Sequence, residues 1–133
     1  MRVSMKLDYT SNLLLNQMIN EYNTKTGLNV NRGFMVNLIM MNISEKYDMF
    51  DWDYISKLVI NSDKSAVVHS TKLNLSYEVV DIVEAIKKDF KNIFPNREIH
   101  FAFVIKQCIK ARYLLSDKEL SKKIIKDKEW KNL

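Results

Sequence analysis

Apolar and polar residues follow the same order of patterns twice along this chain. Each time, a short stretch of alternating apolar and polar residues precedes two stretches with apolar residues at helical spacing. Strict alternation is typical of a half-buried strand, and a spacing of three to four residues is typical of an amphipathic helix. The sequence therefore predicts a strand–helix–helix unit over residues 1–47 and a second unit over residues 67–115.

The first unit opens with alternation from Val3 to Asp8. Thr10 or Ser11 is a suitable N-cap for the helix that follows, and Gly27 ends that helix. Asn31 caps the second helix. We expect the residues at helical spacing to face the interior, namely Leu14, Leu15, Met18, Ile19 and Tyr22 in the first helix and Phe34, Met35, Leu38, Ile39 and Ile43 in the second.

The second unit alternates from Thr71 to Leu75, and Ser76 caps its first helix. Pro95 and Asn96 mark the turn between its helices. A shift of 68 residues superposes the apolar positions of the two first helices, and a shift of 69 superposes those of the two second helices. The inward positions of this unit are Val79, Ile82, Val83, Ile86 and Phe90, then Phe101, Val104, Ile105, Cys108 and Ile109.

One such unit cannot bury its own apolar faces, whereas two units can cover each other. A two-stranded ribbon also needs helices beneath it to be stable in water. We therefore predict a mainly α-helical fold with a two-stranded antiparallel ribbon, formed by both units of one chain as a tandem pseudo-dimer. Residues 48–66 are predicted to be a linker with a short helix capped by Asp51. Residues 116–133 are predicted to be a basic tail helix, in which Ser116 and Glu119 have the spacing of a capping box.

Charge is unevenly distributed along the chain. The formal net charge is +5, and residues 67–133 carry fourteen basic and nine acidic residues. Residues 44–66 carry three basic and five acidic residues. A basic body of this kind suits a phosphate-bearing partner, although ordinary solubilising charge would look the same.

Several function classes find no support in the sequence. The single cysteine, Cys108, excludes an intrachain disulfide and fits the cytoplasm. No apolar run approaches the roughly 20 residues of a membrane span, and we expect no contact with a membrane. His69 and His100 have no partner at metal-ligand spacing. Because phosphate-loop and nucleophile-elbow motifs are also missing, we expect no cofactor, no metal site and no enzyme activity.

The polar face of the predicted ribbon carries the candidate binding residues. If the apolar residues of each strand face the helices, six polar residues face away: Arg2, Ser4, Lys6, Ser70, Lys72 and Asn74. These donors and acceptors are the types that read base edges, and a two-stranded ribbon fits the DNA major groove. The alternative is a solvated sheet face, which also needs polar residues.

Two stretches resemble the ribbon-helix-helix family, the Arc/MetJ type of DNA-binding proteins. Residues Leu73–Val83 resemble its passage from strand to first helix, and Gly27–Arg32 resembles its turn into the second helix. The resemblance implies that five of the strand positions named above read bases, namely Ser4, Lys6, Ser70, Lys72 and Asn74. It also implies that the start of each second helix, at Asn31, Arg32 and His100, holds a DNA phosphate, which agrees with the affinity of free helix N–H groups for anions. Family members usually carry one copy per chain, whereas this chain carries two.

The resemblance and the polar ribbon predict a sequence-specific protein that binds double-stranded DNA. Transcriptional repression, or a DNA-organising role in plasmid or phage biology, is the expected task, and a second copy bound alongside on DNA is an expected partner. The alternative is a protein-interaction module, antitoxin-like or an adaptor. It would work through the tail at residues 116–133 or through the acidic, aromatic insert from Tyr47 to Tyr54.

Overall fold

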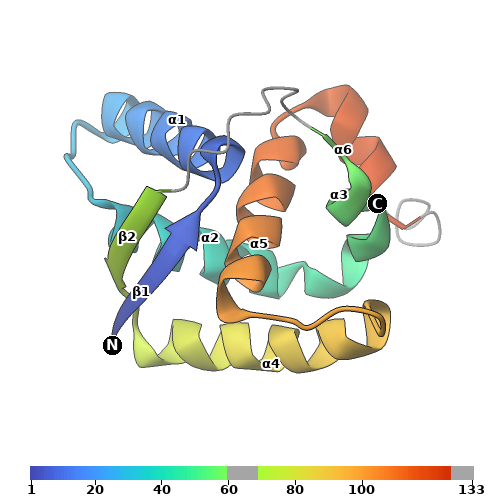
Figure 1. The fold of residues 1–133 in the computed structure, drawn as a ribbon. Helices are drawn as coiled ribbons and strands as arrows, with labels where there is room; N and C mark the ends of the chain where they lie inside the picture. Colours follow the sequence, from blue (N-terminus) through green and yellow to red (C-terminus); the bar gives the residue numbers. More distant parts are fainter. Residues whose placement is uncertain (60–68, 127–133) are drawn as a thin grey trace.

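The computed structural model describes residues 1–59 and 69–126, and for His69 it describes the backbone alone. These residues form a mainly helical structure with one two-stranded antiparallel sheet, as the sequence predicts (Figure 1). In chain order the elements are β1 (Arg2–Leu7), α1 (Tyr9–Thr26), α2 (Arg32–Glu45), the 3-10 helix η1 (Tyr47–Met49), α3 (Trp52–Lys57), β2 (His69–Asn74), α4 (Tyr77–Ile93), α5 (Phe101–Leu115) and α6 (Lys118–Ile124).

The ribbon pairs one strand from each of the two predicted units. β1 pairs antiparallel with β2, from Arg2 opposite Asn74 to Leu7 opposite His69. The backbone N–H of Leu75 donates to the carbonyl of Met1 at 2.8 Å and extends the ladder by one step. Alternate residues of both strands are buried or half-buried, because that face of the ribbon lies on the helices.

The helices pack beneath the ribbon in a pattern that the two halves share. α2 and α5 pack against each other, and α1 and α4 each pack against both of them. α2 also contacts β2, and α5 also contacts β1 (Figure 1). Each second helix therefore supports the strand of the other half of the chain.

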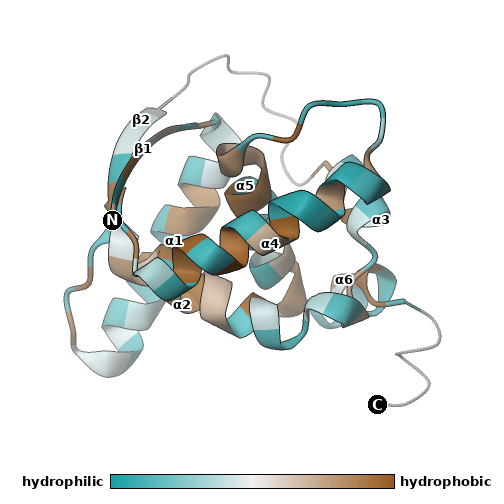
Figure 2. Ribbon diagram, turned by 90° about the horizontal axis from the view of Figure 1, so that it is seen from below, coloured by the Kyte–Doolittle hydropathy of each residue, from teal (hydrophilic) through white to brown (hydrophobic). Residues whose placement is uncertain are grey.

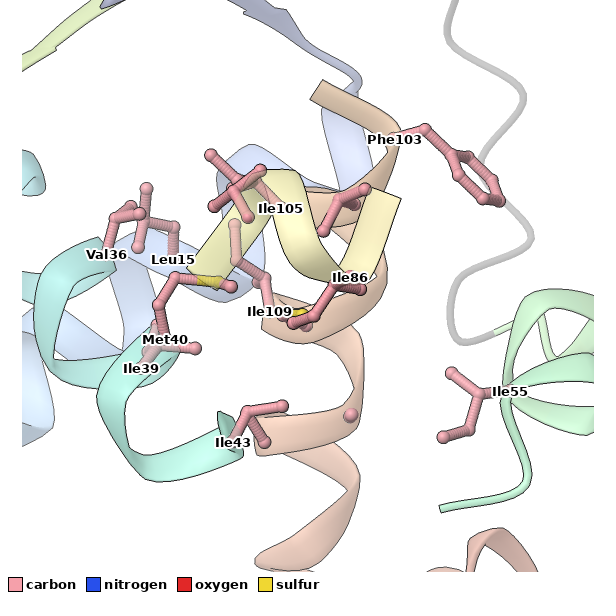
Figure 3. Packing of buried hydrophobic residues seen from close by; sticks show 14 of the residues in the cluster. Leu15, Val36, Ile39, Met40, Ile43, Ile55, Ile86, Phe103, Ile105 and Ile109 are labelled. Atoms are coloured by element: carbon pink, nitrogen blue, oxygen red, sulfur yellow. The ribbon is translucent and has the colours of Figure 1, made fainter. Parts of the chain in front are cut away.

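The core lies where α2, α4 and α5 meet. Figure 3 shows Met40 of α2, Ile86 of α4 and Ile109 of α5 pointing toward one another. Each of these side chains is at most 5% exposed. Burying an aliphatic side chain of this size contributes about 1.5–3 kcal/mol. α4 shows the sequence pattern most clearly, since apolar and polar bands alternate along it (Figure 2).

The predicted helix ends can be compared with the structure. Gly27 ends α1 with a φ of 73°, and the Asn31 and Ser76 side chains accept from the N–H groups of Phe34 and Val79, as predicted. The prediction of Thr10 or Ser11 as the first N-cap is wrong. Asp8 takes that role and accepts from the N–H of Ser11, because β1 ends directly before it and α1 starts at once. The tail helix is likewise capped by Asp117 and not by Ser116.

Two predicted core residues lie at the surface. Phe34 is 43% exposed and Leu38 is 41% exposed. Val36 and Met40, which flank the predicted apolar face of α2 on its other side, are fully buried instead of Phe34 and Leu38. Because α2 turns this side toward α5, Phe34 is left to pack its ring against Tyr22 of α1, with 5.7 Å between centroids. The other predicted inward positions are buried or half-buried.

The insert and the start of the tail pack together. Asp51 caps α3 as predicted, and its own N–H donates to the carbonyl of Ile124 at 2.7 Å. The N–H of Lys126 donates to the carbonyl of Met49 at 2.9 Å. Phe50 and Ile125 form an isolated antiparallel β-bridge. Residues 60–66 of the predicted linker, residues 67 and 68 of the predicted second unit, and the tail from residue 127 on lie outside the described residues.

This packing predicts a large effect of the insert on stability. Trp52 is 3% exposed and its ring lies 5.3 Å from that of Phe90 in α4. Trp52→Ala should lower the free energy of unfolding by about 3–5 kcal/mol, because a buried ring is replaced by a cavity. Urea unfolding followed by circular dichroism measures this loss. The matched control is Tyr77→Ala, since Tyr77 is 73% exposed and should change stability little. Equal midpoints for the two variants would contradict the role of the insert in the core.

Candidate nucleic-acid interface

All six residues predicted to read bases are exposed, and they lie on one face of the ribbon. The register places them directly opposite one another in cross-strand pairs: Arg2 with Asn74, Ser4 with Lys72, and Lys6 with Ser70. Side chains of such pairs have Cβ atoms about 4.5–5.5 Å apart. The structure therefore gathers into one patch, hereafter the ribbon face, residues that lie up to 72 positions apart in the sequence.

The ribbon face is basic and its side chains are not engaged elsewhere. Three of its six residues are cationic, Arg2, Lys6 and Lys72, and none is acidic. Within the described parts of the chain, none of the six side chains takes part in a hydrogen bond or an ion pair. A shallow hollow of about 440 Å³ lies along the two strands. Such a face can offer its donors and acceptors to a ligand without breaking an internal contact.

The predicted phosphate residues lie at the starts of α2 and α5, but two of them already have partners. The Asn31 side chain accepts from the N–H of Phe34 at 2.8 Å as the N-cap. The Arg32 guanidinium donates to Asn12 and to Asn16 of α1, the latter at 3.1 Å. His100 is exposed and makes no capping hydrogen bond with its side chain. Its Nε2 lies 3.9 Å from a carboxylate oxygen of Glu98.

Sequence reasoning missed two residues that hold the ribbon face in place. A Cβ on Gly33 would lie 3.0 Å from both the backbone N and the backbone O of Asn74. Nδ2 of Asn37 donates to the carbonyl of Asn74 at 3.2 Å, and its Oδ1 accepts from the N–H of Ser76 at 3.1 Å. The signal that could have found this contact is Gly33 itself, because glycine near the start of a helix is unfavourable without a packing reason.

The four aromatic side chains of the insert are buried or half-buried. Phe50 is 1% exposed and Trp52 is 3% exposed. Tyr47 is half-buried, stacks on Trp52, and donates its hydroxyl to Asp89 of α4. Burial and this hydrogen bond raise the pKa of Tyr47. Phe50 and Trp52 thus pack inside the molecule, Tyr47 and Tyr54 keep part of their surface, and docking through the insert stays a prediction.

The described residues show no constellation for metal or thiol chemistry. No group of three or more His, Cys, Asp or Glu side chains within residues 1–59 and 69–126 could hold a metal ion. Cys108 is fully buried, and burial raises the pKa of its thiol, so it stays protonated at neutral pH. No helix in the same ranges is long and apolar enough to span a membrane.

Comparison with known proteins adds no relative to this description. No protein-family model, no curated protein and no solved structure matches the chain. The resemblance to the ribbon-helix-helix family therefore stays a prediction. The candidate site is defined by the residues of this chain alone.

The contact between α2 and β2 predicts an unusual response to Gly33→Ala. Replacing glycine by alanine inside a helix normally stabilises a protein by about 0.4–1 kcal/mol. Here the new methyl group would press on the Asn74 backbone, so we expect a loss of about 1–3 kcal/mol. Thermal unfolding gives the sign directly. A stabilised variant would contradict the close approach of α2 to the end of β2.

Proposed function

We propose that this chain binds double-stranded DNA in a sequence-specific manner, with the ribbon face in the major groove. The observation that carries this proposal is the gathering of six polar side chains, which have no polar partner among the described residues, on one exposed face of a two-stranded ribbon. A ribbon of two strands has the width that the groove admits, and these residue types match the donors and acceptors of base edges.

The charge of the molecule supports a phosphate-rich ligand. The chain has a formal net charge of +5, and the ribbon face contributes three of its cations. We propose that the starts of α2 and α5 contact the DNA backbone, with Arg32 and His100 as the side chains involved. The Arg32 guanidinium is held in place by Asn12 and Asn16 of α1, and the residue itself lies in the first turn of α2, whose N–H groups favour an anion.

The shared packing of the two halves supports a tandem ribbon-helix-helix pseudo-dimer. α2 contacts β2 and α4, and in the same way α5 contacts β1 and α1. Joining the two halves in one chain avoids the entropy cost that separate subunits meet on association. We propose a cytoplasmic, non-catalytic and cofactor-independent role in repression or in the organisation of plasmid or phage DNA. A second copy would bind alongside on longer sites.

Lys72→Ala tests whether the ribbon face reads DNA. Lys72 lies at the centre of the ribbon face, between buried Leu73 and half-buried Thr71, so its loss should leave the fold intact. We expect specific binding to weaken by about 1–3 kcal/mol. Fluorescence anisotropy on a DNA site selected from a random library measures the change. Lys88→Ala removes the same charge from the exposed surface of α4 and should leave specific binding nearly unchanged. Equal affinities of both variants would rule the ribbon out as the reader.

Variants of Arg32 test the proposed phosphate contact. Phosphate contacts carry no sequence information, so Arg32→Ala should weaken binding to specific and to random DNA by the same factor. It should also reduce the slope of log affinity against log salt by about 1. Arg32→Lys keeps the charge but loses the forked geometry that reaches two asparagines. If Arg32→Lys and Arg32→Ala lose DNA affinity equally, the side chain acts only on the fold.

A further inference from the structure

The two ends of the ribbon face carry different chemistry. Arg2 and Asn74 are paired at one end, and Lys6 and Ser70 are paired at the other. An arginine can make two hydrogen bonds to guanine, and an asparagine can make two to adenine. A lysine is a flexible point charge and a serine has one short hydroxyl, so neither discriminates bases as sharply. The chemistry for precise readout is concentrated at the first end.

The same end is fixed from below by α2. Asn37 uses both atoms of its amide group, as donor to the carbonyl of Asn74 and as acceptor from the N–H of Ser76. Gly33 brings the α2 backbone close enough for this bond. The N–H of Leu75, between the two contacts, is bonded to the carbonyl of Met1. The backbone at the last residue of β2 is therefore held on each side, which fixes the direction of the Asn74 Cα–Cβ bond before any ligand binds.

Within residues 1–59 and 69–126, nothing equivalent holds the other end. The shift of 69 residues that relates α2 to α5 places Ala102 at the position of Gly33 and Lys106 at that of Asn37. A lysine ammonium only donates hydrogen bonds and cannot accept one from a backbone N–H. Among the described residues, Lys106 makes no hydrogen bond to β1. The difference between the two ends thus lies in the supporting helices as well as in the ribbon.

We propose that the ribbon face has a polarity, with the Arg2–Asn74 end determining specificity and Asn37 acting as the positioning residue for Asn74. This inference rests on the proposed function. The target would be a non-palindromic site with a G·C pair and a nearby A·T pair at one end, contacted by Arg2 and Asn74. The Lys6–Ser70 end would contribute mostly affinity. One chain would bind its site in a single orientation.

The test is selection of binding sites from random double-stranded DNA with the wild type and with single variants, followed by affinity measurements. The wild type should select a non-palindromic motif. Asn74→Ala should reduce the preference for adenine at one position by about 5- to 150-fold, and Arg2→Ala should do the same for guanine close by. Asn37→Ala should reduce the preference for adenine at the same position and leave the affinity for random DNA unchanged. Asn42→Ala, farther along the same helix, is the matched control and should leave the motif intact.

The outcomes separate the inference from the proposed function. A palindromic motif, or an Asn37→Ala variant that weakens specific and random binding equally, would overturn the polarity while DNA binding stands. Failure of the wild type to bind any duplex at low salt would overturn both. If Asn37→Ala does not fold, Asn37→Asp keeps the acceptor for Ser76 and removes the donor to Asn74. This variant should also reduce the preference for adenine at that position, and an unchanged motif would exclude the positioning role.

Discussion

The pairing of β1 with β2 is the constraint on which the rest of the structure depends. The strands come from opposite halves of the chain, and a ribbon of two strands is marginal on its own in water. Its apolar face therefore fixes where the helices must lie, with Leu7 and Leu73 fully buried on them. The same pairing decides which side chains remain outside, because a slip of one residue would reverse both faces.

The helices beneath the ribbon stabilise one another as well as the strands. α2 and α5 pack against each other and each also contacts the strand of the other half, so neither half is complete alone. The insert and α6 then cover one flank, where Trp52 of the insert meets Phe90 of α4. Because these contacts join segments distant in sequence, formation of the ribbon and closure of the core should be one cooperative event.

Local sequence patterns predicted the strands and helices well, because where these elements begin and end depends mainly on residues that are neighbours in the chain. Alternation identified both strands, and Gly27, Asn31 and Ser76 marked helix ends by their own chemistry. The errors arose where distant segments decide. Phe34 has the spacing of a core residue, yet the direction in which α2 faces α5 leaves it exposed. The role of Asn37 was missed because its partners, Asn74 and Ser76, are nearly forty residues away, and Gly33 gave the only local signal of this contact.

The buried position of Cys108 has a practical consequence. It is the only cysteine in the chain, and its side chain points from α5 into the core with no exposed surface. A maleimide dye should therefore react with it only when the protein opens, so the rate of labelling reports local or global unfolding without any substitution. Cysteines introduced on the surface could be labelled selectively in the native protein, which opens it to distance measurements by fluorescence.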